Sequence, residues 1–309
     1  MSASTAPPVA VRRPVDPAVR AWLSLAVVEA VRFARHPLFL AGVVASAISF
    51  GLLLPGEANN ADRLNAGISA LFIGLTGMVG AYRRTASMRV SSDVVDSAPA
   101  SPVSRTAALC AACLVPAAAG LVAWLFTLWS LGRWPLPEWT YGGLSDADVV
   151  ALTASQTVIA SLGGPLLGVT AARWLQFRGA PLLLTLGVTV WVFTVGQFTL
   201  QADHVQGWQT ALRMFSPFAF FQTLTRDSRA MQTFPGSVPW YAAWQLGLCG
   251  LAVVAALLKD SVGVARRRLV TAGAVTLVLA ATAYVLAVTG GLPDVLVTRA
   301  DGTTARGGR

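Results

Sequence analysis

The residues YRRTASMRVSSDVVDSAPASPVSRTAAL (82–109) interrupt a chain that is otherwise strongly apolar. Four arginines and two aspartates arrive together in this stretch and are followed by two prolines. Long apolar runs precede it and follow it. Because a spanning helix excludes charge from its interior, this pattern predicts two membrane helices joined by a charged turn outside the bilayer.

The composition extends this interpretation to the whole chain. Of 309 residues, 55% are hydrophobic and only 12% are charged, and the mean hydropathy is +0.62. Soluble domains contain about 25% charged residues, so a soluble core could not bury this much apolar surface. We therefore expect an all-α, polytopic helical membrane protein.

Seven segments have the length and composition of spanning helices, which need roughly 20 mostly apolar residues. None has a charged residue in its interior, where each Arg or Asp would cost about 2.5–3.5 kcal/mol. The first six are expected to form a core over residues 38–268, and the seventh an additional C-terminal helix. The segments are 38–55, 64–82, 103–131, 149–172, 179–200, 239–258 and 269–291.

The distribution of basic residues predicts the orientation. With the N-terminus in the cytoplasm, inner segments carry fifteen of the 23 Lys and Arg residues, which agrees with the positive-inside rule. Because these basic residues stand in short blocks between apolar runs, we expect no nucleic-acid partner for this chain of net charge +9. We expect a multi-pass protein of a bacterial cytoplasmic membrane, with a disordered inner tail at 1–19 and a flexible outer tail at 292–309.

Residues 20–37 predict an amphipathic helix that lies in the membrane interface before the first span. At about 100° per residue, Arg20, Glu29, Arg32 and Arg35 share its polar half, and apolar residues form the other half. Pro37 disfavours helical geometry at His36, so the chain can bend there into the first span. The alternative is a simple extension of that span.

The outer segment 201–238 is the longest loop and is rich in Phe and Trp. These residues place it at the level of the lipid headgroups. It forms either an ordinary aromatic belt or a pair of short helices that dip into the bilayer. Ser216-Pro217 resembles a helix N-cap followed by proline, so a short helix is expected to begin there.

Polar and small residues gather in the fourth span. Gly163, Gly164 and Pro165 are expected to bend or break that helix, and Gln156 and Ser161 precede them; Gln197 lies late in the fifth span. Two interpretations stay open. The residues form either a kinked, polar-lined translocation surface or a tight helix contact through small side chains.

Several classes of chemistry lack their residues. The only lysine is Lys259, preceded by Leu258, so the chain has no Walker A motif and no nucleotide site of that type. No catalytic pair or metal-ligand cluster is visible, and Cys110-x-x-Cys113 fits helix packing better than a redox site. We expect neither a cofactor nor a metal on this chain, and no enzymatic activity.

The opening stretch itself predicts a short cytoplasmic helix. Val90, Val94 and Ala98 recur at i, i+4 and i+8, Pro99 ends the helix, and Ser101-Pro102 caps the next span. As a topology signal alone, the arginines at 83 and 84 would suffice. A helix between two rigid joints can transmit force from a partner.

These features resemble the integral-membrane subunit of ABC-2 type ABC transporters. The likeness covers about residues 20–268 and rests on the interfacial helix, on RFARHPLFLAG (32–42), on the charged loop 83–104 with Pro102-Val103-Ser104-Arg105, and on the long loop before the sixth span. Members usually have six spans, whereas this chain has a predicted seventh.

The resemblance implies a permease that exports a hydrophobic or amphipathic substrate. It would pair with a second copy or a paralogue through the first, second and fifth spans, and ATP and Mg²⁺ would bind a separate P-loop ATPase. The residues expected to contact that ATPase are Arg83, Arg84, Arg89, Asp93 and Asp96.

Two other functions compete with this one. A non-transport membrane protein, such as an assembly or immunity factor, would need no ATPase. An intramembrane enzyme would need a catalytic pair that the sequence does not display.

Overall fold

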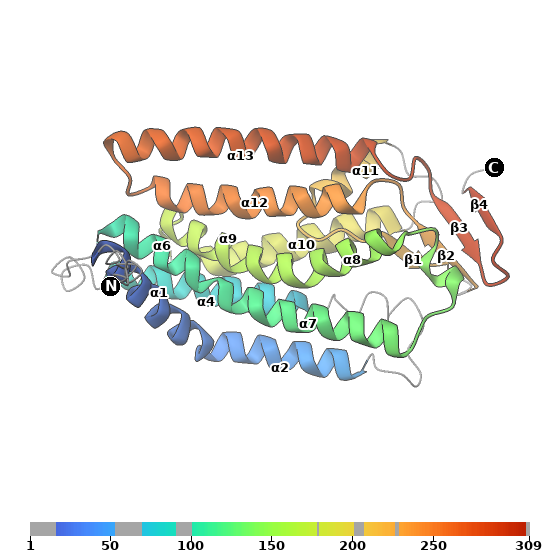
Figure 1. Cartoon of the computed structure of the whole chain (residues 1–309), viewed down its shortest axis with the longest axis horizontal. Helices are drawn as coiled ribbons and strands as arrows, with labels where there is room; N and C mark the ends of the chain where they lie inside the picture. The colour runs from blue at the N-terminus through green and yellow to red at the C-terminus, as the bar shows by residue number, and fades with distance from the viewer. Residues whose placement is uncertain are drawn as a thin grey trace, which may run out of the picture.

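The computed structural model describes residues 17–52, 70–90, 101–177, 179–200, 207–225 and 229–306. These residues form an elongated bundle of roughly parallel and antiparallel helices with a small sheet at one end (Figure 1). The helices are α1 (Pro17–Ala34), α2 (Pro37–Leu52), α4 (Leu71–Val90), α6 (Pro102–Ala112), α7 (Leu114–Arg133), α8 (Asp146–Ala154), α9 (Ala160–Trp174), α10 (Ala180–Leu200), α11 (Gly207–Phe215), α12 (Val238–Leu258) and α13 (Gly263–Thr289).

Several long apolar helices indicate a multi-pass membrane protein. By length and composition, four helical stretches of the described chain can cross a bilayer, and α1 with α2 makes a fifth if that bent pair is one span. The four are Pro102–Arg133, Asp146–Trp174, Val238–Leu258 and Gly263–Thr289. They coincide with four of the seven predicted spans.

The remaining predicted spans do not reach the same criterion on their own. Helix α4 begins at Leu71 and has arginines from residue 83, so its apolar stretch is short. In α10, the described side chains cover only Ala180–Gly196, which is shorter than a candidate span. The seven-span prediction is thus confirmed only as a mostly helical, multi-pass arrangement.

The joint between α1 and α2 lies where the sequence predicts it. Helix α1 ends at Ala34, α2 begins at Pro37, and the two are bent by 56°. The side of α1 turned away from the bundle exposes Leu23, Val27 and Val31, as expected for a helix against lipid.

Side-chain caps fix two helix starts, and the cap predicted at Ser101 is confirmed. Ser101 caps α6, with its hydroxyl accepting from the Ser104 amide at 3.1 Å. Ser145 and Asp148 form a capping box at the start of α8, so Asp148 stabilises a helix end, as its position at the start of the fourth span indicates.

The fourth span is not broken at Gly163-Gly164-Pro165, contrary to expectation. Helix α9 runs through Pro165 to Trp174. The irregularity lies one to two turns earlier, where Ser155–Ile159 form a π-helical turn. A π turn shifts the backbone hydrogen bonds locally by one residue, and the span continues from it directly into α9.

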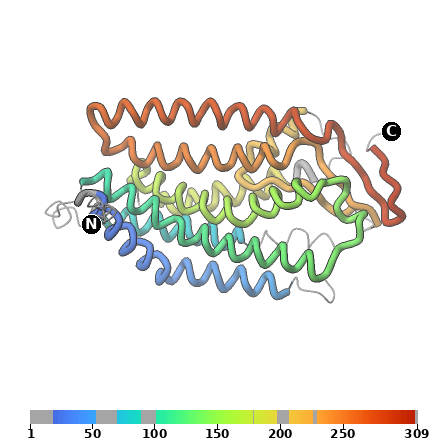
Figure 2. Tube along the Cα trace, viewed as in Figure 1, coloured from blue at the N-terminus to red at the C-terminus, as the bar shows by residue number. Residues whose placement is uncertain are grey.

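The sheet contradicts two further expectations. It is antiparallel in the order β1 (Gln222–Leu224), β2 (Ala230–Thr233), β3 (Leu296–Arg299), β4 (Thr304–Arg306). The fold is therefore mostly helical rather than all-α, and the tail 292–309, expected to be flexible, supplies β3 and β4 (Figure 2). No helix begins at Ser216, because α11 ends at Phe215 and the chain then leads into β1.

Charge divides the molecule into two ends. We call the end with α1, the last turns of α4 and α9 and the start of α13 the basic end; it holds Arg32, Arg35, Arg83, Arg84, Arg173, Arg266, Arg267 and Arg268. The other is the sheet end. Because α1 and β4 lie at opposite ends of the bundle (Figure 1), the described path fits an odd number of crossings.

Candidate functional site

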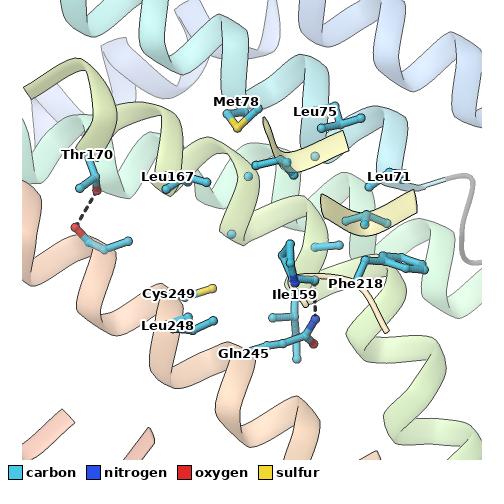
Figure 3. Close-up of a pocket in the computed structure, with 18 of the residues that line it drawn as sticks. Leu71, Leu75, Met78, Ile159, Leu167, Thr170, Phe218, Gln245, Leu248 and Cys249 are labelled. Atoms are coloured by element: carbon cyan, nitrogen blue, oxygen red, sulfur yellow. Dashed lines mark hydrogen bonds between the residues drawn. The ribbon is translucent and has the colours of Figure 1, made fainter. Parts of the chain in front are cut away.

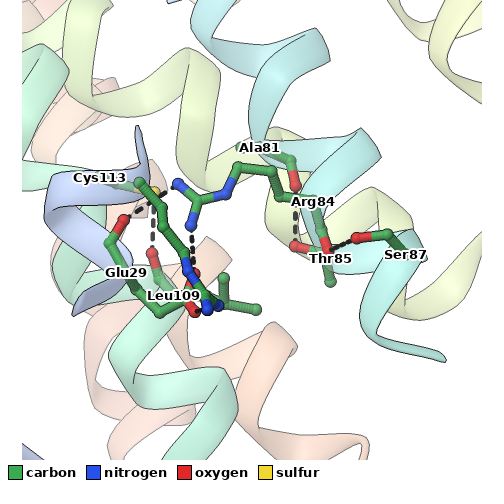
Figure 4. Close-up of polar contacts among 8 residues, drawn as sticks. Glu29, Ala81, Arg84, Thr85, Ser87, Leu109 and Cys113 are labelled. Atoms are coloured by element: carbon green, nitrogen blue, oxygen red, sulfur yellow. Dashed lines mark hydrogen bonds and ion pairs between the residues drawn. The ribbon is translucent and has the colours of Figure 1, made fainter. Parts of the chain in front are cut away.

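A buried ion pair joins α1 to α4 at the basic end (Figure 4). The Glu29 side chain is 1% exposed and that of Arg84 is 12% exposed. One Arg84 Nη donates to the backbone oxygen of Glu29 at 3.0 Å, and the other contacts the carboxylate. Arg32 Nη1 lies 3.2 Å from the second carboxylate oxygen. The Glu29 carboxylate is thus held by two guanidinium groups.

An aromatic ring also contacts Arg84. Its guanidinium lies 5.5 Å from the ring centroid of Phe33, within the range of a cation–π contact. Phe33 in turn packs edge-on against Phe39 of α2 at 5.6 Å. The cluster therefore fixes the bent α1–α2 joint onto α4.

The predicted ATPase contacts divide between two environments. Arg83 is exposed on α4, whereas Arg84 turns inward to Glu29 and does not lie on a loop. Arg89 belongs to the last turn of α4. Asp93 and Asp96 lie outside the described residues.

The predicted polar face of α1 needs a correction at one residue. Arg20, Arg32 and Arg35 are exposed as expected, but Glu29 is buried. A helical wheel of α1 places every charged residue on the solvent side. It contains no information about α4, whose Arg84 guanidinium contacts this carboxylate.

Helix α4 packs on α9 with almost no side chain between the two backbones. A Cβ placed on Gly164 would overlap the carbonyl oxygen of Gly74, and one on Gly168 would overlap that of Met78. Small residues four apart allow this close approach in membranes. The tight-packing interpretation of Gly163-Gly164-Pro165 is therefore the one that the geometry favours at Gly164.

An apolar cavity of about 400 Å³ lies between α4, α9, α10 and α12 (Figure 3). The Gly74–Gly164 contact forms part of its wall, and Leu71, Met78, Leu248 and Cys249 line it from two sides. Pockets of 300–1,000 Å³ with mostly apolar walls are typical of small-molecule sites. No charged side chain lines this one.

Gln245 is the main polar residue on the cavity wall, and its amide is already engaged. Its Nε2 donates to the Pro217 carbonyl at 2.8 Å and contacts the Tyr241 hydroxyl at 3.0 Å. Its Oε1 accepts from the Ser155 hydroxyl in the π turn. The amide thus ties α12 to α8–α9 and to the loop after α11.

Of the residues predicted to line a path, only the two glycines reach this cavity. Gly163 and Gly164 are lining residues. Gln156 and Ser161 are buried but do not line the cavity, and Pro165 packs against Gly77 of α4. Gln197 lies in the last turn of α10. The wall of this cavity is apolar apart from a few polar side chains.

A second ion pair at the basic end was not predicted. Arg173 at the end of α9 contacts the Asp260 carboxylate after α12, and the Thr106 hydroxyl of α6 lies 3.3 Å from the same carboxylate. The two positions are far apart in sequence, so only their occurrence near helix ends could have signalled the pair.

At the sheet end, Arg213 of α11 is buried, and no carboxylate among the described residues pairs with it. It donates to the Pro235 carbonyl and lies 5.2 Å and 5.1 Å from the Phe221 and Phe234 ring centroids. Burial lowers the pKa of Arg213 to about 9, while Tyr241 acts in the opposite direction. The residue stays a cation at neutral pH and holds the sheet-end loop together.

The comparisons with known proteins identify no relative. No family model matches the chain, and no curated protein and no solved structure matches it. Within the described residues, no three His, Cys, Asp or Glu side chains gather as metal ligands. The candidate site pairs the buried Glu29–Arg84 ion pair at the basic end with an apolar cavity.

Proposed function

We propose that this chain is the membrane-spanning subunit of an ATP-driven transporter of the ABC-2 type. In this proposal it crosses the bacterial cytoplasmic membrane seven times and exports a hydrophobic or amphipathic substrate, and ATP and Mg²⁺ bind a separate P-loop ATPase. The observation that supports it best is the chain of contacts from α1 through Glu29–Arg84 to α4, and from α4 to the cavity.

Each step of this mechanical route is a direct contact. Arg84 ties α1 to α4 at the basic end. Helix α4 then packs backbone to backbone on α9 at Gly74 and Gly164, and both glycines line the cavity. A displacement of α1 or of the last turn of α4 would therefore reach the cavity wall without a flexible intermediate.

The surface offered to an ATPase is the exposed part of the basic end. Arg83 and Ser87 on α4 and Arg20, Arg32 and Arg35 on α1 are accessible. We assign the initial binding to these residues, and Arg84 to force transmission through Glu29. Arg89, Asp93 and Asp96 continue the same segment and stay proposed contacts.

A second permease subunit would meet the row formed by α2, α4 and α10. Helix α4 packs against both α2 and α10, and α2 exposes Leu40, Val44 and Ile48. An apolar face of this kind can be covered by lipid or by a second copy or paralogue. The resemblance favours the latter.

The test is an affinity purification of the tagged chain from gently solubilised native membranes, with partners identified by mass spectrometry. We expect a stoichiometric P-loop ATPase that is lost in an Arg20→Glu/Arg83→Glu variant. The matched control is Arg299→Glu/Arg306→Glu, which reverses the same charges at the sheet end and should retain the ATPase.

Other outcomes would redirect the assignment. Recovery of the intact chain with no ATPase in several mild detergents would favour an assembly or immunity factor. An ATPase that is retained equally by both charge-reversal variants would leave the transporter in place but remove the basic end as its contact surface.

A further inference from the structure

We propose that the cavity beside α10 binds one acyl chain of a membrane lipid, which enters laterally from the bilayer. This inference deepens the proposed function, because it names the chemistry of the ligand that the same cavity accepts. Its test uses the purified chain alone, so the absence of an ATPase would not affect the result.

A second cavity adjoins the first, and we call the two together the slot. The second cavity, of about 450 Å³, lies between α10 and α12 and includes Trp191 and Trp244 in its lining. The two share Val188, Pro217 and Leu248. Helix α10 is thus separated from α12 along several turns.

The outer side of α10 has the character of a lipid-facing surface. Leu182 is 63% exposed and Leu183 is 60% exposed, and Leu183 also lines the second cavity. A Cβ added to Gly187 would meet no atom within 4 Å. The slot therefore borders the same surface that hydrocarbon chains would cover.

The walls favour hydrocarbon over peptide, water or ion. Thr170, a polar lining residue, already donates to the Leu166 and Ala252 carbonyls at 2.9 Å and 2.8 Å, and the Gln245 amide is engaged as described. A buried peptide group without a partner costs about 1–3 kcal/mol, and a stable buried water needs about 2–4 polar partners. An alkyl chain needs none.

A lipid chain in the slot would contact α10 on one side and α12 on the other. In the transport cycle, the same slot would hold the apolar tail of an amphipathic substrate.

The experiment uses the full chain, purified and reconstituted in nanodiscs that contain a phosphatidylglycerol with a diazirine in one acyl chain. After illumination, crosslinked peptides are located by mass spectrometry. We expect lipid on interior residues such as Met78, Leu248 and Cys249, in addition to the outward-facing helix surfaces.

Two cavity-filling variants test the position of the chain. Gly163→Leu projects into the first cavity, where a Cβ would lie 3.4 Å from Cys249 Sγ, and Gly187→Leu projects into the second. The control is Gly132→Leu on α7, where a Cβ also meets nothing within 4 Å and which lines neither of the two cavities. Interior labelling should fall about tenfold in the first two, as for ~1.4 kcal/mol of lost binding free energy.

Labelling confined to outward-facing residues such as Leu277 and Val278 of α13 would overturn the proposal. Equal interior labelling in Gly187→Leu and Gly132→Leu would do the same. If Gly163→Leu fails to fold, the Gly187→Leu comparison decides the question by itself.

Discussion

At the residue scale, Glu29 should be costly to replace, because its carboxylate is buried at the basic end. A carboxylate that is 1% exposed is tolerated only because Arg84 and Arg32 compensate its charge. Removing one partner of a buried pair costs about 3–5 kcal/mol, because the other charge stays buried alone. An exposed pair typically contributes less than about 1 kcal/mol.

Glu29→Gln and Arg84→Met should each lower the free energy of unfolding by about 3–5 kcal/mol. The double variant should cost less than the sum, since neither charge is then left alone. Arg32→Gln is the matched control, because the Arg32 side chain is 68% exposed, and its cost should be under about 1 kcal/mol. Denaturant titration in mixed micelles measures all four, and equal costs for Glu29→Gln and Arg32→Gln would contradict the buried pair.

Sequence alone could predict the exposed arginines but not the buried Glu29–Arg84 ion pair. The spacing of Arg20, Arg32 and Arg35 on one helix face is local information, and the structure keeps them exposed. The burial of Glu29 depends on Arg84, a residue of another helix. Long-range pairing of this kind has no periodic signal, and the same holds for Arg173 and Asp260.

At the scale of elements, the contact between α4 and α9 depends on glycines that differ in their surroundings. Gly164 faces the Gly74 backbone, whereas its neighbour Gly163 faces the cavity. The two glycines are neighbours in the same helix, so their helix propensities are equal, but the room for a side chain differs between them. Comparing substitutions at the two positions therefore separates backbone packing from helix propensity.

Gly164→Ala should destabilise the chain by about 1–3 kcal/mol, the usual cost of overpacking, because the new methyl would overlap the Gly74 carbonyl. Gly163→Ala should be close to neutral, since its Cβ would lie 3.4 Å from Cys249 Sγ at ordinary contact distance. Thermal unfolding in one detergent compares the two. A larger loss in Gly163→Ala would refute the assigned faces.

Helix ends were the most predictable elements. Pro37, Ser101-Pro102 and Asp148 carry local start signals, and the structure uses each of them. The strands were not predictable, because Thr304–Arg306 is too short for a pattern and is fixed only by its partner Leu296–Arg299. No local residue pattern predicts the π turn at Ser155–Ile159 either.

At the scale of the whole molecule, the distribution of arginines between the two ends indicates which side of the membrane each end faces. The arginines of α1, α4 and α13 gather at the basic end, and the C-terminal strands lie at the other. Four or five candidate spans satisfy length and composition. Helices α2, α4 and α10 complete the seven crossings that we propose, and over the described residues they do not meet this criterion singly.

Ser87→Cys and Thr304→Cys should therefore be accessible from opposite sides of the membrane. Both positions are exposed, and the native cysteines are buried. With a membrane-impermeant maleimide on intact cells, we expect labelling of Thr304→Cys and not of Ser87→Cys until the cells are opened. Labelling of both or neither in intact cells would mean an even number of crossings between the two positions.

The pairing of β2 with β3 also sets an order of events during synthesis. Thr233 is the register partner of Leu296, and α12 and α13 lie between them. The ribosome therefore releases β2 long before its neighbour exists, and β2 must wait with an open edge while a helical hairpin is inserted. The sheet can therefore form only after both helices have been inserted into the bilayer. A completed sheet marks a chain whose last two helices are in place.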